Sequence, residues 1–240
     1  MCDALATTRE HVPPSCFFPA GYRTDLWTVP ACRSHNQDNS PDVEYTRSII
    51  ALDGSTNQIA RELVRSKVRR SWERSPLLKA RTFKRVAPSV VRGQRTAIVE
   101  ADLPRFNCII SSIAFAIYFR ETGVRWQRDW LVYSSTMVAG KVAFEGRPDP
   151  LNPPLRATLT DIPFEARNVP QPAVFQYGVF EESTDDLLYR FTFYEGAVVY
   201  AIASHRVAAA FRADESLARR PRTPDPCVVR PLGKHRGSGM

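Results

Sequence analysis

The sequence predicts an α+β fold, with a small strand–strand–helix module at the N-terminus, a basic amphipathic helix, and a larger C-terminal α+β region containing an antiparallel meander. Three observations predict this fold. The first 50 residues are rich in cysteine, histidine and proline, two later segments place apolar residues at helical spacing, and three β-prone runs follow. We therefore expect the module at 1–52, a basic helical segment at 53–90, the α+β domain at 91–215 and a disordered tail at 216–240.

The N-terminal module holds two of the four histidines and three of the five cysteines of the chain. Thr7–Val12 favours a short strand, Leu26–Val29 a second strand, and the stretch from Cys32 toward Ile50 a helix that Pro41 could break. A segment this small rarely buries enough apolar area to fold unaided. In a reducing compartment, clustered cysteines more often hold metal than form disulfides, so we expect a metal to stabilise the module.

Residues 56–74 form the next predicted element, an amphipathic helix. Its apolar residues recur at helical spacing: Ile59, Leu63, Val64, Val68 and Trp72. Trp72 belongs to this stripe, which favours a core role over a platform for base stacking. Ten basic and two acidic residues lie between Arg61 and Arg85, a local surplus equal to the net charge of +8 of the whole chain. Such a charge run is either a solvated helix face or a track for a phosphate backbone.

A second predicted helix opens the C-terminal region. Asp102 can cap it, Pro104 suits its first turn and Gly123 ends it. One face carries Phe106, Ile109, Ile110, Ile113, Ala116 and Ile117. The β-prone runs beyond it are Ala173–Phe180, Leu187–Tyr194 and Ala197–Ala203. Short polar segments separate these runs, as in an antiparallel meander.

The bulk composition narrows the partners and the location. A net charge of +8 and a pI near 9.5 favour a polyanion, such as nucleic acid or an anionic membrane surface. The longest apolar run, Cys108–Phe119, is too short and too interrupted to span a bilayer. The first residues have neither the cationic flank nor the apolar stretch of a signal peptide. We therefore expect a cytoplasmic protein that does not associate with a membrane.

The first 40 residues contain the residue types that phosphodiester hydrolysis requires, a base for water and ligands for a charge-neutralising cation. His11 can serve as the base, because a neutral imidazole titrates near neutral pH. Glu10 supplies a carboxylate of the kind that Mg²⁺ prefers, and Asn36 supplies an amide oxygen. Adjacent residues of a flat strand point to opposite faces, so a distorted strand end would be needed to unite Glu10 and His11. Taken alone, Glu10–Pro14 is more often a polar strand that runs into a turn.

Cys32 and His35 form a second, independent signal. Two ligands separated by two residues at a helix start are a usual half-site for tetrahedral Zn²⁺, and Cys2 offers a third ligand. The fourth ligand stays open: a residue upstream of Met1, Cys16 or a water molecule could fill the place, or zinc is not bound. Without zinc, Cys32 would be a buried thiol and His35 a surface imidazole.

Together these residues resemble the HNH endonuclease family. Its members commonly read Cys-x-x-Cys, then Thr-Arg-Glu/Asp-His-Val/Ile-Pro-Pro, then a Phe-Pro loop and Val-Pro-x-Cys-x-x-Cys-Asn. This chain has Thr8-Arg9-Glu10-His11-Val12-Pro13-Pro14, Phe17-Phe18-Pro19 and Val29-Pro30-Ala31-Cys32-Arg33-Ser34-His35-Asn36. The match is specific over the first 50 residues and looser beyond them, in segments such as Ala116–Gly123 and Phe193–Val199.

The resemblance implies a ββα-metal (His-Me) finger, in which His11 is the general base while Glu10 and Asn36 bind a catalytic Mg²⁺ or Mn²⁺. It also implies a structural Zn²⁺, held by the half-site outside the reaction centre. The sequence departs from the family in three ways: the first Cys of the leading pair is missing, His35 stands where Cys is usual, and Asn39 where many members have Lys. The first two departures concern zinc, and only the third touches the reaction centre.

We therefore expect a metal-dependent endonuclease that prefers DNA, with a homodimer as one option because cutting both strands often needs two copies. Contacts to the phosphate backbone are assigned to basic residues of the helical segment: Arg61, Arg65, Lys67, Arg69, Arg70 and Arg74. The alternative is a non-catalytic, zinc-stabilised module that binds nucleic acid through the same helix. A third interpretation is a metal-stabilised domain for protein contacts, whose basic helix meets an acidic partner.

Overall fold

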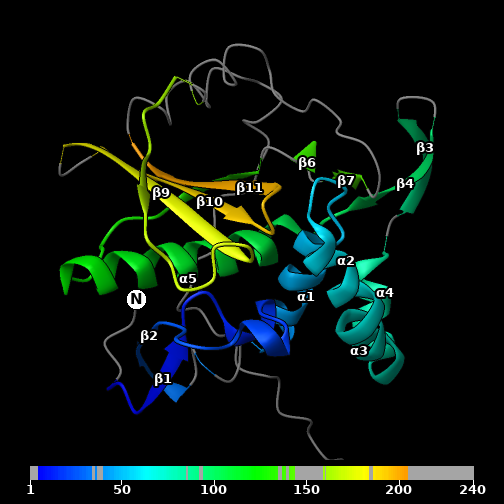
Figure 1. Cartoon of the computed structure of the whole chain (residues 1–240), viewed down its shortest axis with the longest axis horizontal. Coiled ribbons are helices and arrows are strands. Elements are labelled where there is room, and N and C mark those ends of the chain that lie inside the picture. The colour runs from blue at the N-terminus through cyan, green and yellow to red at the C-terminus, as the bar shows by residue number, and fades with distance from the viewer. Residues whose placement is uncertain are drawn as a thin grey trace, which may run out of the picture.

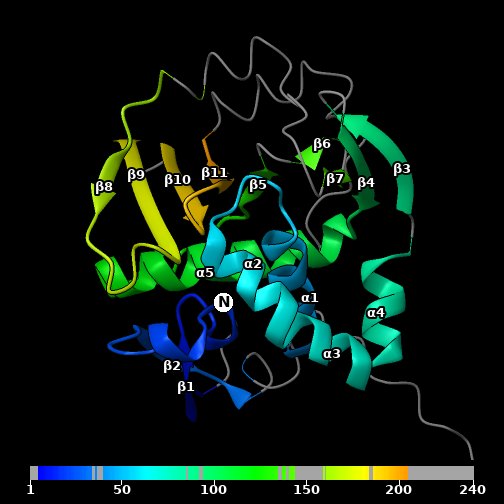
Figure 2. The same cartoon turned by 45° about the vertical axis from the view of Figure 1, so that its right-hand side comes forward.

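The computed structural model describes residues 5–33, 36, 40–84, 86–91, 94–134, 137, 138, 141–143, 159, 161–183 and 186–204. Helices and antiparallel sheets are mixed along these residues, which confirms the α+β class. A long helix, α5 (Leu103–Thr122), has a five-stranded sheet on one side and a short N-terminal hairpin on the other (Figure 1 and Figure 2). The tail predicted at 216–240 lies outside the described residues.

The N-terminal hairpin pairs β1 (Thr8–His11) with β2 (Thr28–Ala31) in antiparallel register. Two single 3₁₀ turns, η1 (Ser15–Phe17) and η2 (Ala20–Tyr22), lie in the connection. The first strand is therefore found where the sequence predicted it, whereas the second lies two residues further along than predicted. Pro30 can sit inside β2 because a two-stranded sheet leaves one side of each strand without ladder partners.

Helix α1 (Ser40–Ala51) follows the hairpin and includes Pro41 in its first turn, where proline is tolerated. Helical backbone is also found at Arg33 and Asn36, and the N–H of Asn36 donates to the carbonyl of Cys32 at 3.1 Å. From Tyr45 to Ala51 every residue of α1 is buried. A helix buried on all sides is a central element, and α1 contacts η1, the basic helix and α5.

The predicted basic helix is present and continues through a π-helical turn. It comprises α2 (Gln58–Leu63), the π turn η4 (Val64–Val68) and α3 (Arg69–Arg74). Asn57 caps its start, because its side chain accepts from the N–H of Ala60. A further helix, α4 (Pro76–Thr82), packs beside it. The rings of Trp72 and Phe83 meet edge-on, with their centroids 4.8 Å apart. Trp72 is therefore a packing residue, as its place in the apolar stripe predicted.

Helix α5 has the ends that the sequence predicted. The Asp102 side chain accepts from the N–H of Arg105, and Gly123 closes the helix in the left-handed conformation at φ 70°. Its apolar face is buried, including Phe106, Ile110 and Ile117. Within the described ranges no helix, α5 included, has the length and apolarity needed to cross a bilayer.

The predicted meander forms the centre of the five-stranded sheet. Its order is β5 (Leu131–Ser134), β11 (Ala197–Ala203), β10 (Asp186–Phe193), β9 (Phe175–Ser183) and β8 (Glu165–Arg167), and all neighbours are antiparallel. One face packs on α5, and the other carries a smaller apolar cluster around Tyr133 and Leu188. The meander prediction is therefore confirmed in type and order.

A second sheet, which the sequence analysis did not predict, has the order β3-β4-β7-β6. β3 (Val86–Val91) and β4 (Gln94–Glu100) pair as a hairpin, which β7 (Lys141–Ala143) and β6 (Met137–Val138) extend. The helical prediction for 53–90 therefore extends too far, since β3 begins at Val86. The three valines of β3 favour a strand, whereas the basic residues before them suggested that the helix continued.

One hydrophobic core joins the predicted ranges. Its members include Val12 and Phe17 of the N-terminal module, Leu63 and Val68 of the basic helix, and Phe106 and Phe191 of the C-terminal region. The Tyr194 hydroxyl also donates to the carbonyl of Phe17 at 2.6 Å. The boundaries expected after residues 52 and 90 therefore do not separate hydrophobic cores, and the small module packs against the rest of the chain.

Candidate functional site

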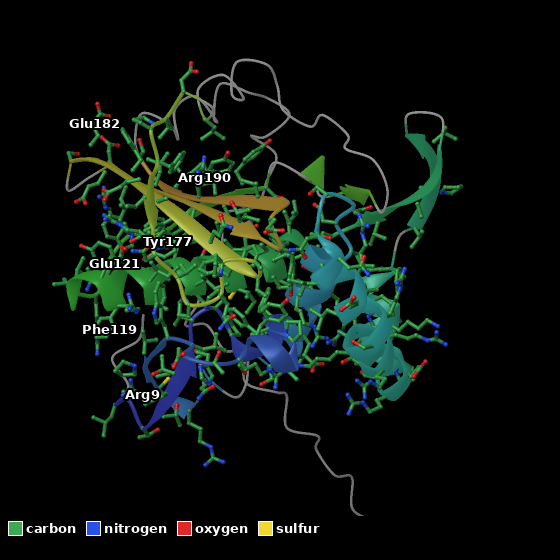
Figure 3. The ribbon with its side chains drawn as sticks, in the orientation of Figure 1. Arg9, Phe119, Glu121, Tyr177, Glu182 and Arg190 are labelled. Carbon is green, nitrogen blue, oxygen red and sulfur yellow. The ribbon has the colours of Figure 1, made fainter. Side chains whose placement is uncertain are left out.

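The register of the N-terminal hairpin fixes which way Glu10 and His11 point. Glu10 lies opposite the buried Val29, and His11 lies opposite Thr28. Because side chains alternate along a strand, Glu10 takes the inner face of the hairpin and His11 the outer face. Arg9 shares this outer face, since its Nε donates to Thr28 Oγ1 at 2.9 Å, and it projects away from the core (Figure 3).

Asn36 reaches back from the helical turn to β1. Its Nδ2 donates to Thr8 Oγ1 at 3.1 Å and to the carbonyl of Arg9 at 3.2 Å. Thr8 Oγ1 in turn donates to the carbonyl of Ala31 at 2.9 Å, which ties the contact into both strands. Thr8 and Glu10 are two residues apart and share the inner face, so Asn36 and Glu10 lie on the same side of the hairpin. Neither bond uses Oδ1 of Asn36, the atom that a cation would contact.

Glu10 occupies a largely buried position. Burial raises the pKa of its carboxyl to about 7, because the charged form loses hydration. Among the described residues it forms no hydrogen bond and no ion pair that would offset this loss. A carboxylate kept in such a place is a candidate for a functional group, and a bound cation would favour its charged form.

His11 is half-buried at the end of β1, and its Nδ1 is buried without a hydrogen-bond partner. A buried ring nitrogen that lacks a partner costs free energy, so its retention needs a reason. The ladder stays regular beyond His11, since the N–H of Val12 donates to the carbonyl of Trp27 at 2.9 Å. The strand distortion expected to unite His11 with Glu10 is therefore not seen, whereas Asn36 is hydrogen-bonded to Thr8 and Arg9, the two residues before Glu10 on β1.

The predicted zinc ligands are only partly covered by the structure. Cys2 and His35 lie outside the described residues, and Cys32 is half-buried directly after β2. In the part of the chain that the structure describes, no group of three or more histidine, cysteine and acidic residues could hold a metal. Cys16, the other candidate for the fourth position, is half-buried against the main core.

The six basic residues assigned to the phosphate backbone differ in their surroundings. Arg61, Arg65, Arg69, Arg70 and Arg74 are exposed, while Lys67 is half-buried. Arg69 pairs with Glu73 at 3.0 Å, and the Nε groups of Arg70 and Arg74 donate to helix carbonyls. Among the described residues, the side chains of Arg61 and Arg65 form no hydrogen bond or ion pair. These two are therefore the most available for an external anion.

One charged residue of the interior was not predicted from the sequence. Arg47 of α1 is fully buried, and both Arg47 and Arg23 lie within electrostatic range of Lys67. A sequence signal exists, because position 47 is at helical spacing with Val43 and Ile50, both of which are buried. An arginine on the apolar face of a helix therefore predicts a buried charge.

No protein-family model matches the chain, and no curated protein or solved structure is similar to it.

Proposed function

We propose that the protein is a metal-dependent endonuclease of the HNH type, whose hairpin and following helical turn act as a ββα-metal finger. The observation that carries the proposal is the pair of hydrogen bonds from Asn36 to β1. These bonds bring an amide from the helix to the inner face of the strand, where the unpaired carboxyl of Glu10 lies.

The donor set fits a hard cation. A carboxylate and an amide oxygen are ligands that Mg²⁺ and Mn²⁺ accept, and two protein ligands leave the remaining positions to water and a substrate phosphate. When bound, the ion neutralises charge that develops on the phosphate and on the leaving oxygen. Glu10 would hold it as a carboxylate, and Asn36 would be kept in place by its bonds to Thr8 and Arg9.

His11 is proposed as the general base that takes a proton from the attacking water. Its Nδ1 carries no protein hydrogen bond, so this nitrogen is free to accept a proton. His11 is also the last residue of β1, so its side chain lies at the end of the strand, on the outer face of the hairpin. The scissile phosphate must therefore lie at this end of the hairpin, between the two faces, for all three residues to act on it.

The basic helix would hold the rest of the substrate. Arg61 and Arg65 are exposed and unpaired in the described part of the chain, as contacts to a phosphate backbone require. Such contacts release counterions and make binding fall with salt concentration. A DNA substrate is proposed on this basis, with a structural zinc at Cys2, Cys32 and His35 as a separate part of the same proposal.

The test is cleavage of plasmid DNA with Mg²⁺ or Mn²⁺. His11→Ala and Glu10→Gln should each lower the cleavage rate roughly 10²–10⁴-fold, the usual contribution of a positioned base or of charge stabilisation. Arg9→Ala is the matched control, because Arg9 lies on the same strand as both residues and has no role in the proposed chemistry. Cleavage by His11→Ala at the rate of the unaltered chain would overturn the assignment of the base.

A second function is favoured by one observation, the opposite faces of Glu10 and His11 on a regular ladder. If the faces stay separate, the module binds nucleic acid through the basic helix without cutting it. This alternative predicts salt-sensitive binding that neither His11→Ala nor Glu10→Gln changes, together with no cleavage by the unaltered chain.

A further inference from the structure

Arg47 is a buried cation whose donors are mostly unused. It is 0% exposed, its Nη2 donates to Ser71 Oγ at 3.3 Å, and its Nε and Nη1 have no hydrogen-bond partner. A buried guanidinium is normally paired with an acid, because an unpaired charge in the interior strongly destabilises the fold. An unsatisfied group of this kind in a folded protein calls for a ligand, an ion or another function.

Two more cations, each from a different element, share the electrostatic surroundings of Arg47: Lys67 interacts with both Arg47 and Arg23, and all three act on the thiol of Cys16. Lys67 belongs to the π turn η4, and Arg23 follows η2 and donates from Nε to the carbonyl of Phe18 at 2.9 Å. Burial lowers the pKa of Lys67, and the neighbouring Arg23 and Arg47 lower it further. Of the described residues, no acid lies within ion-pair distance of any of the three cations. The cluster therefore carries repulsion that no ion pair among the described residues offsets.

The nearby groups of the chain do not supply the missing anion. Glu44 is within electrostatic range of Lys67, but it forms no ion pair with the cluster in the part of the chain described. Cys16 is the other candidate, since Arg47, Lys67 and Arg23 all act on it. Burial raises the pKa of the Cys16 thiol, so it stays protonated and neutral at physiological pH.

Two members of the cluster are accessible to solvent. Arg23 is exposed and Lys67 is half-buried, while Arg47 is fully buried. Lys67 and Ser71 are four residues apart on the basic helix, so both can face α1, where Arg47 resides. Lys67 also lies in the π turn, a distortion that is frequent at functional sites.

We propose that Arg23, Lys67 and Arg47 form a binding site for a phosphate-type oxoanion. Arg23 and Lys67 make the outer contacts, and Arg47 supplies the inner charge together with the unused donors. A tetrahedral oxoanion offers several acceptors at once, so it satisfies these donors and offsets the repulsion among the cations. The anion is either free phosphate or one phosphate of a nucleic-acid backbone that passes from the basic helix to the loop before β2. Only the second source rests on the proposed nuclease function.

The first arm of the test uses inorganic phosphate, compared with chloride at the same ionic strength. Phosphate should raise the thermal midpoint of the unaltered chain by roughly 5 °C when it exceeds its Kd about a hundredfold. Lys67→Met and Arg47→Met should lose this rise. Lys79→Met is the matched control, an exposed lysine of α4 outside the cluster, and should keep it.

The second arm measures binding of a short DNA duplex by fluorescence anisotropy, without divalent cations, so that cleavage plays no part. If the site takes a backbone phosphate, Lys67→Met should weaken binding roughly tenfold at low salt and more than Lys79→Met does. A response to phosphate alone assigns the site to a free oxoanion, and a response in the DNA arm assigns it to the backbone. If neither arm separates Lys67→Met from Lys79→Met, the site does not exist. Lys67→Met decides the matter if Arg47→Met does not fold, and neither readout depends on Glu10 or His11.

Discussion

Two glutamates of the same molecule, Glu121 and Glu10, differ in the hydrogen-bond partners of their carboxyl groups. Glu121, near the end of α5, accepts the hydroxyls of Tyr177 and Tyr189 at 2.9 Å each, and Arg167 lies 3.7 Å from it (Figure 3). Glu10 on the hairpin is more than half buried, and burial alone raises the pKa of its carboxyl. Glu121 therefore has the partners of a structural carboxylate, whereas Glu10 lacks them.

The difference separates stability from function. A carboxylate whose acceptors are filled by phenols joins helix to sheet, and Tyr177 also meets Trp27 of the N-terminal loop edge-on at 6.0 Å. A carboxylate that is dehydrated without partners destabilises the folded state when it is charged. Sites that bind ions or substrates are places where such a cost is retained. The difference therefore supports the proposed functional role of Glu10, whereas the contacts of Glu121 are those of a structural residue.

Removing Glu121 should have the largest effect on stability. Glu121→Leu leaves two buried phenol hydroxyls without their acceptor, which should lower the free energy of unfolding by about 2–3 kcal/mol. Urea unfolding followed by fluorescence measures this change. Glu181→Leu is the control, because Glu181 is exposed and has no partner among the described residues. Equal midpoints for the two variants would show that the Glu121 contacts contribute nothing.

The elements around Glu121 were predictable because their signals are local. Asp102, Pro104 and Gly123 mark the ends of α5 within the sequence itself, and alternation together with short polar turns marks the three strands of the meander. Both predictions hold. The second sheet was missed because Val86 follows a run of basic residues that suggested more helix.

The candidate site depends on contacts between distant residues, and here local patterns are insufficient. Asn36 meets Thr8 across 28 positions, a contact that the sequence did not predict, although Asn36 was expected to join Glu10 of the same strand. The register of the hairpin decides that Glu10 faces inward and His11 outward, a choice that strand alternation alone leaves open. Arg47 carried a local signal, its place on the apolar face of α1, but its unused donors follow from packing between elements.

The second-largest expected effect is a dependence of stability on pH, which Glu10 should cause. Its pKa is about 7 in the folded chain and near the ordinary value of 4.5 when unfolded, so folding favours the protonated form. The stability is therefore greatest below pH 4.5, falls as the pH rises toward 7, and levels off above it. Since Glu10 is partly exposed, the expected fall is about 1–2 kcal/mol.

Glu10→Gln carries no charge and should remove this fall, so that the variant is more stable than the unaltered chain at pH 8 and equal to it at pH 4. Urea unfolding across this range in a metal chelator measures the difference, and Glu181→Gln serves as the control. If the free energy of unfolding depends on pH in the same way for the unaltered chain and for Glu10→Gln, the carboxyl of Glu10 is hydrated in the folded chain. Its contrast with Glu121 would then be weakened.

The same contrast extends to the arginines and gives the smallest expected effect. Arg167 is occupied, since it pairs with Glu165 at 2.6 Å and lies near Glu121, whereas Arg61 has no partner in the described part of the chain. If Arg61 contacts a phosphate, Arg61→Ala should reduce the dependence of log K on log salt by about one and weaken DNA binding only a few-fold. Arg167→Ala should leave that slope unchanged, because its charge is already offset by two carboxylates. If the slope of log K against log salt is the same for the two variants, Arg61 does not contact the phosphate backbone. DNA binding would then depend on net charge alone.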